Sequence, residues 1–227
     1  MRCLSALTFV CLSVIALFGQ AIKDDRDLSK YGSVEYDKND PDRLDSRRVT
    51  ISQRYDNDHW VYSRVHPETG GVGRIKEEPP PPLIPVDESA CIVIGRVGKV
   101  EAFLSNDKHG VYSEFTINID EVLKKDGLKK ARGYVVADRE GGVVVYPGGQ
   151  RVRYANSDQD IPVRGTQYLF FLTTDSVSPN YRILTSYELT TNGFRQMEMG
   201  QSLGEFKDAN KDTFLKAIRR RLAPLSN

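Results

Sequence analysis

The chain has 227 residues, and its 32 Lys and Arg against 31 Asp and Glu give a net charge of +1 at pH 7. A chain so close to neutrality is not drawn to polyanions by bulk charge, so nucleic acid is not an expected partner. The length suits one domain of about 100–200 residues together with an extension.

Residues 1–21 have the pattern of an export signal peptide. Arg2 supplies the positive charge, Leu7 to Phe18 is a short apolar stretch, and Gly19-Gln20-Ala21 places small residues at the first and third positions before a cleavage site. The apolar stretch is shorter than the roughly 20 residues that span a bilayer, so we expect cleavage and no membrane span afterwards. The sequence thus predicts an exported protein, periplasmic or extracellular.

Cleavage would leave Cys91 as the single cysteine, because Cys3 and Cys11 belong to the leader. One cysteine permits no internal disulfide, so the domain must be stabilised by its core. A nucleophilic cysteine would need a histidine held close to it. We therefore interpret Cys91, at the entrance of an apolar strand, as a small buried residue.

Residues 22–88 form a polar arm. Between Ile22 and Arg48 charged residues dominate, and such a stretch buries too little apolar surface to offset its ordering entropy, which predicts disorder or loose extended chain. The alternation in 49–65 is typical of a β-hairpin. Pro79 to Pro82 predicts a stiff spacer ahead of the domain, although such a stretch can also serve as a ligand for an aromatic groove.

Residues 89–199 predict a mainly β domain, a small OB-like closed barrel of five to six strands. The first strand, Ala90 to Leu104, carries Gly95 and Gly98 where the apolar period breaks, and glycines at such a place mark a bulge at which a strand coils to close a barrel. Tyr112 to Leu123 shows clear alternation of apolar and polar residues. Further strands are predicted at Tyr134 to Ala137, Val143 to Tyr146, Gln150 to Tyr154, Thr166 to Leu172, Tyr181 to Leu189 and Phe194 to Met197.

Residues 200–227 predict a C-terminal helix and tail. Lys211 to Leu222 has apolar residues at the helical spacing, and Asn210 is a suitable N-cap. The arginines at 219–221 suit the negative end of the helix dipole, which we favour over an anion-binding patch.

The strand pattern CIVIGRVGKVEAF, VYSEFTINIDEVLK, a glycine-rich hairpin, GTQYLFFL and YRIL is similar to that of uncharacterised exported bacterial proteins. The architecture resembles the OB-like barrel of the tissue-inhibitor-of-metalloproteinase and netrin-module superfamily. The likeness covers Ala90 to about Leu189, and it implies a fold rather than an activity. That inhibitor family chelates the metal of a protease through a free N-terminal cysteine, and Cys91 is internal and alone, so this mechanism is not carried over.

Catalytic motifs are lacking in the sequence. The three histidines are dispersed, without a zinc-binding spacing, and neither a G-x-S-x-G elbow nor a P-loop occurs. Asp138 and Glu140 would make a pair of carboxylates, but Arg139 lies between them and the predicted turn favours a solvated loop. We therefore favour a protein that is not an enzyme, and we predict no metal site and no cofactor.

The best local candidate for a ligand site is the strand at 150–154, where Arg151 and Arg153 point to the same side. With Arg139 and Tyr146 across the hairpins, they would form a basic, aromatic-edged surface for an acidic peptide or a glycan. The other interpretation is that these charges protect a sheet edge from mispairing.

The functional prediction is an exported, non-enzymatic binding or interaction module, with the barrel as scaffold and an unknown protein, peptide or glycan as partner. The alternative is a regulator or inhibitor of an extracytoplasmic hydrolase, or a hydrolase without a recognisable motif. A pocket in which titratable groups converge would favour the alternative.

Overall fold

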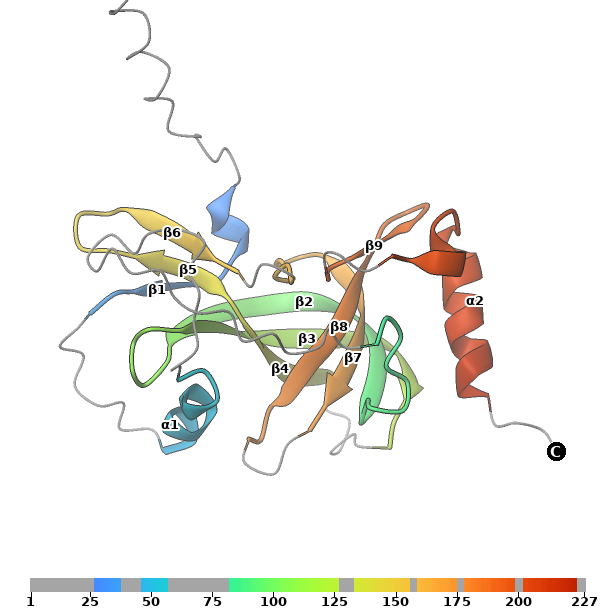
Figure 1. Ribbon diagram of the computed structural model, residues 1–227, viewed down its shortest axis with the longest axis horizontal. Coiled ribbons are helices and arrows are strands. Elements are labelled where there is room, and N and C mark those ends of the chain that lie inside the picture. The colour runs from blue at the N-terminus through green and yellow to red at the C-terminus, as the bar shows by residue number, and fades with distance from the viewer. Residues whose placement is uncertain are drawn as a thin grey trace, which may run out of the picture.

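β-Strands are the main regular structure of the described chain (Figure 1). The computed structural model describes residues 27–37, 46–56, 82–126, 133–155, 159–174, 178–198 and 202–223. Its elements are η2 (Leu28–Lys30), β1 (Ser33–Glu35), α1 (Ser46–Gln53), β2 (Cys91–Leu104), β3 (Val111–Lys124), β4 (Tyr134–Glu140), β5 (Gly142–Val145), β6 (Arg151–Tyr154), β7 (Gln167–Thr173), β8 (Tyr181–Leu189), β9 (Phe194–Gln196), η3 (Gly204–Phe206) and α2 (Lys211–Leu222).

Five of the strands close into a barrel. The larger sheet has the order β4-β3-β2-β7-β8-β9, and a parallel pairing of β4 with β8 joins its two sides. The closed ring is therefore β2-β3-β4-β8-β7, and its other neighbours are antiparallel. β9 pairs with β8 outside the ring. The predicted mainly β fold, an OB-like closed barrel with a C-terminal helix, is confirmed.

The predicted bulges of the first strand are also present. The register of β2 against β3 shifts between Ile94 and Gly95 and again between Val97 and Lys99. A side chain at Gly95 would not fit, because its Cβ would lie 2.5 Å from the carbonyl oxygen of Asn118. Glycine here lets the backbones of β2 and β3 approach each other at the bulge where β2 bends.

Gly95→Ala is expected to lower the free energy of unfolding by about 1–3 kcal/mol, the usual cost of overpacking. Gly98→Ala is the matched control, because the atom nearest its Cβ, at 2.7 Å, is the side-chain nitrogen of Asn118, which can rotate away. Urea denaturation followed by circular dichroism measures both. Equal losses in the two variants would contradict the role assigned to the backbone contact.

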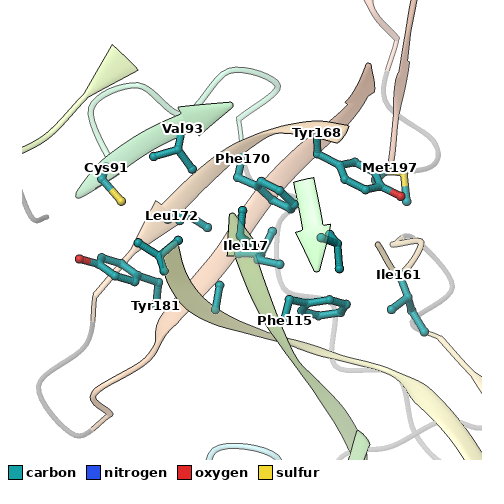
Figure 2. Packing of buried hydrophobic residues seen from close by; sticks show 14 residues of the cluster. Cys91, Val93, Phe115, Ile117, Ile161, Tyr168, Phe170, Leu172, Tyr181 and Met197 are labelled. Carbon is teal, nitrogen blue, oxygen red and sulfur yellow. The ribbon is translucent and has the colours of Figure 1, made fainter. Parts of the chain in front are cut away.

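Apolar side chains fill the barrel interior (Figure 2). Phe115 and Ile117 project from β3, and Phe170 and Leu172 from β7, all of them fully buried. Cys91 lies among them with no exposed surface, as predicted. Both faces of β2 and β7 are covered, which explains their continuous apolar runs, because the opposite face packs against α2 in a second cluster.

The C-terminal helix agrees with its prediction residue for residue. The side chain of Asn210 accepts a hydrogen bond from the amide of Thr213 at 2.9 Å, and so caps the helix. Phe214, Leu215 and Ile218 are buried against the outside of β2, β7 and β8. This cluster fixes the helix on the barrel.

The hairpin predicted at 49–65 is wrong in its first half. Residues 46–53 form the helix α1, and the second half of that hairpin lies outside the described residues. Val49 and Ile51 alternate as a strand would, but the burial is helical, because Ile51 and Tyr55 are four positions apart and pack together against Tyr112. Residues 1–21, predicted as a signal peptide, and Pro79 to Pro81 also lie outside the described residues.

Part of the polar arm is ordered, contrary to the prediction of loose chain up to Arg48. Residues 27–37 contain η2 and β1, and β1 pairs in parallel with β5. Val34 and Tyr36 pack against a third apolar cluster, and the amide of Tyr36 donates to the carbonyl of Val145 at 2.8 Å, so packing and backbone hydrogen bonds both hold this polar segment on β5. The strands β1, β5 and β6 form a small second sheet (Figure 1).

Candidate binding surface

The small sheet has an apolar inner face, and on its other face Val143 and Val145 lie between polar residues of β1 and β6. Its order is β1-β5-β6, and the register places Val34, Val144 and Val152 in one row. This row packs against residues of the β2–β3 hairpin. The two neighbouring rows, which point the other way, end on β6 in Arg151 and in Arg153. The prediction that these two side chains share one side of the strand is confirmed.

Among the described residues β6 pairs with β5 alone, so its other side is an edge of this sheet. The turn that precedes it is as predicted: Gly148 and Gly149 have φ of 101° and 84°, and the amide of Tyr146 bonds the carbonyl of Gln150 at 2.8 Å. Hydrogen-bonded pairs then recur every second residue, so the backbone of Val152 faces β5 and that of Arg151 and Arg153 faces outward. On β5 the same alternation turns the backbone of Val143 and Val145 toward the arm. The amide of Val143 donates to the carbonyl of Gly32, and the amide of Tyr36 donates to the carbonyl of Val145.

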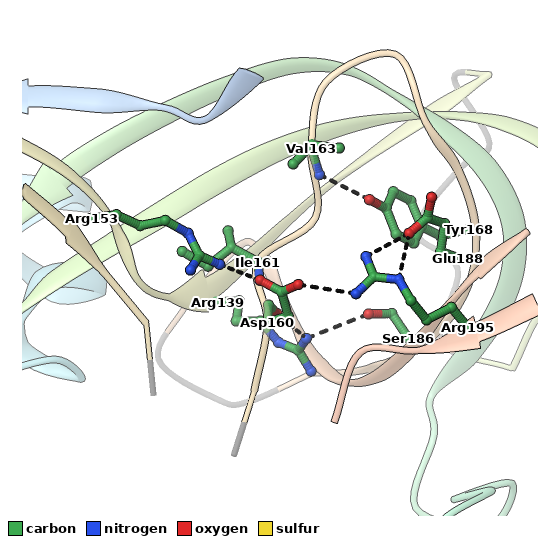
Figure 3. Close-up of polar contacts among 9 residues, drawn as sticks. All are labelled: Arg139, Arg153, Asp160, Ile161, Val163, Tyr168, Ser186, Glu188 and Arg195. Carbon is green, nitrogen blue, oxygen red and sulfur yellow. Dashed lines mark hydrogen bonds and ion pairs between the residues drawn. The ribbon is translucent and has the colours of Figure 1, made fainter. Parts of the chain in front are cut away.

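Asp160 gathers three arginines beside this sheet (Figure 3). Its Oδ1 accepts from Arg153 and from the amide of Ile161, and its Oδ2 lies 3.3 Å from Nη1 of Arg195. Its carbonyl oxygen accepts from Nη1 of Arg139 at 3.0 Å. The structure thus brings together two of the four residues predicted for the surface, Arg139 and Arg153, around one aspartate.

Arg139 is not part of an exposed turn, because β4 continues through Glu140. The residue is only 2% exposed, and its Nη2 forms an ion pair with Glu198, which is buried as well. Glu198 also accepts from the hydroxyl of Thr185 and, at 3.4 Å, from the amide of Ser186. The exposed position predicted for Arg139 is wrong, because the side chain crosses into the barrel toward a carboxylate distant in sequence.

The arginines around Asp160 are already neutralised. Arg195 binds Glu188 at 2.6 Å in addition to Asp160, and Arg153 lies over the ring of Tyr31 at 4.8 Å. Together with the pair of Arg139 and Glu198, the cluster holds three positive and three negative side chains. An acidic ligand would have to displace these contacts to reach Arg153, whereas the side chain of Arg151 is exposed.

Tyr146 belongs to the buried part of the small sheet. It is 7% exposed, its hydroxyl hydrogen-bonds that of Tyr154, and its ring centroid lies 5.2 Å from that of Tyr36. Burial raises the pKa of Tyr154. Two shallow hollows beside these rings each have room for about one water molecule. Both are smaller than the ~300 Å³ at which sites for small molecules usually begin.

The two candidate carboxylates are separated from each other. Asp138 is fully buried in β4, where its Oδ1 lies 2.6 Å from Arg54, and it is not in the predicted solvated loop. Glu140 is half-buried and lines one hollow with His109. Over the part of the chain that the structure describes, three or more His, Cys, Asp or Glu side chains nowhere group as metal ligands would. The carboxylates were misplaced because β4 is longer than predicted.

The fold class is therefore a small closed β-barrel with an added sheet. Protein-family models, curated proteins and solved structures were all compared with the chain, and none of them matches. The barrel agrees with the fold that the resemblance implied, whereas kinship with the metalloproteinase-inhibitor and netrin superfamily stays a prediction. Within the described ranges, each helix is too short or too polar to cross a membrane.

Proposed function

We propose that the protein is a non-enzymatic interaction module that binds an extended acidic peptide along the outer edge of β6. The observation that supports this is the direction of the backbone groups of Arg151 and Arg153, which point away from β5 at the end of a sheet. An exposed edge of this kind accepts a peptide as an additional strand, with main-chain hydrogen bonds supplying affinity.

The side chain of Arg151 gives the edge its preference in charge. It is exposed beside the outward backbone groups, where a carboxylate on the added strand could reach it. The two hollows are too small to enclose a ligand, so an extended peptide fits this region better than a compact molecule. The export signal pattern adds the proposal that this binding takes place outside the cytoplasm.

The test uses the full chain and a short labelled peptide of alternating Glu and Val. Arg151→Pro removes the outward N–H of β6 and leaves the hydrogen bonds between β6 and β5 in place. We expect it to weaken binding of the Glu-Val peptide by about tenfold or more. Arg151→Gln keeps the N–H and removes only the charge, which should cost about two- to fivefold. Fluorescence polarisation measures both.

The site is mapped by the amide resonances of Arg151 and Arg153, which are expected to shift when the peptide is added. A peptide of alternating Lys and Val is the control for charge and should cause smaller shifts. Equal binding to wild type and to Arg151→Pro, or shifts confined to other strands, would overturn the proposal.

A further inference from the structure

The helix α1 covers the outer face of the barrel, on the side of the β2–β3 hairpin opposite the small sheet (Figure 1). Arg54, in the turn after α1, lies 2.6 Å from the carboxylate of Asp138 on β4. Arg48 approaches Glu114 on β3 at 3.5 Å, and Arg47 donates to the side chain of Asn180 at 2.7 Å. Every arginine of this segment therefore binds the barrel.

The face beneath α1 carries a row of acidic side chains. The register places Glu101 on β2 opposite Glu114 on β3, and Glu114 opposite Asp138 on β4. Like charges directly opposite one another on a sheet are destabilising. Lys99 of β2 pairs with Glu101 at 2.7 Å, whereas Glu114 and Asp138 receive positive charge from Arg48 and Arg54 of the α1 segment. Desolvation raises the pKa of Glu114, the nearby Arg48 and Arg47 lower it, and Asp138 and Glu101 raise it.

Aromatic side chains complete the face. The rings of Tyr55 and Tyr112 stack with centroids 4.6 Å apart, and the guanidinium of Arg48 lies 3.4 Å above the ring of Phe103. The hydroxyl of Tyr112 hydrogen-bonds Ser52 at 3.0 Å. Arginine and aromatic groups of this kind dominate the energetics of protein–protein interfaces.

Two loops form the rim of this face. Asn106 in the β2–β3 loop donates to the carbonyl of Val49 and to Asp56, and the amide of Asp107 donates to Asp56 at 3.1 Å. Asn180, in the β7–β8 connection, binds Arg47 at the other side. In five-stranded barrels of the OB type, the second and third strands with the first-to-second and fourth-to-fifth loops hold the ligand. In this barrel those parts are β3, β4 and these two loops, and α1 occupies them.

We propose that this face is a second interaction surface, and that α1 with the turn after it is its internal occupant. The partner that it fits is a helix followed by a turn, with arginines where this chain has Arg47, Arg48 and Arg54. This face is independent of the proposed peptide site on β6, because the two lie on opposite sides of the β2–β3 hairpin.

Displacement is feasible because α1 is short. Its eight residues are too few for a stable isolated helix, so docking must supply the free energy that orders it. A partner helix that is already folded does not bear this ordering cost. The tether of α1 to the barrel raises its effective concentration and keeps the face covered until such a partner is present.

The test uses the full chain and a labelled peptide of residues 46–56 with a staple within residues 46–53, so that the part that is helical in α1 is held as a helix. In the variant Arg48→Glu/Arg54→Glu, α1 is repelled by Glu114 and Asp138, and we expect the peptide to bind at least about tenfold more tightly than to wild type. The matched control is Arg164→Glu/Arg220→Glu, which changes the charge equally at two exposed positions away from this face and should bind as wild type does. Equal affinity for all three proteins would overturn the proposal.

A second measurement needs no variant. Saturating stapled peptide is added to the wild-type chain, and hydrogen exchange of residues 46–56 is expected to accelerate at least tenfold as α1 is displaced. The same peptide with its three arginines replaced by Gln should leave this exchange unchanged. Unchanged exchange with the arginine peptide, or equal acceleration by both peptides, would refute the internal-occupant role of α1, and neither result depends on the Glu-Val peptide.

Discussion

Glu198→Ala is expected to lower the free energy of unfolding by about 3–5 kcal/mol, the cost of removing one member of a buried ion pair. The guanidinium of Arg139 would remain charged at 2% exposure with its carboxylate gone. The hydroxyl of Thr185 and the amide of Ser186 would lose their acceptor in the same step. Chemical denaturation at neutral pH, followed by circular dichroism, measures the loss.

The control is Glu188→Ala, which removes the partner of the exposed Arg195 and should cost about 1 kcal/mol or less. The double variant Arg139→Met/Glu198→Leu is expected to regain most of the stability lost in Glu198→Ala, because no charge is left buried. Similar costs for Glu198→Ala and Glu188→Ala would contradict the burial argument. A double variant as unstable as the single one would show that shape rather than charge determines the loss.

The barrel was predictable because its signals are local. β8 and α2 have the predicted bounds, and β2 and β7 differ from theirs by one residue, since apolar alternation and capping are visible within a few positions. The closure was predictable from Gly95 and Gly98, because a strand that must coil needs positions without a side chain.

The elements of the arm were missed because their partners lie far away in the sequence. Ser52 of α1 bonds Tyr112, 60 positions later, and β1 pairs with β5 more than a hundred positions away. Val49 to Arg54 satisfies both a strand and a helix pattern in isolation. Packing of Ile51 and Tyr55 on the barrel decided between them, and this contact has no local signature.

Two of the four residues of the candidate surface were placed correctly, because their signal is local. Arg151 and Arg153 share a face because alternation in a short strand is local. Arg139 was misplaced, although one signal was available: it continues the spacing of Val135 and Ala137, which are buried in the barrel. Its partner Glu198, 59 positions later, carries no sign of this pairing, so the charge appeared to require solvent.

The thiol of Cys91 is expected to react with a disulfide reagent at least about 10³-fold more slowly in the native protein than in the unfolded chain. Two properties cause this: the side chain has no exposed surface, and burial raises the pKa of the thiol to about 12, so the reactive thiolate is scarce at neutral pH. Reaction then requires opening of the barrel, and a native domain with about 5 kcal/mol of stability opens rarely.

The measurement uses the chain with Cys3→Ser and Cys11→Ser, so that only Cys91 is labelled. Phe170→Ala, which removes a fully buried ring from the same cluster, is expected to cost about 3–5 kcal/mol and to accelerate labelling by about 10²–10³-fold. The control is Ser202→Cys, which adds a thiol at an exposed position. This thiol should react at once and so shows that the reagent is active. Fast labelling of Cys91 in the native protein, or no acceleration by Phe170→Ala, would contradict a closed interior around the start of β2, because both rates depend on the same opening.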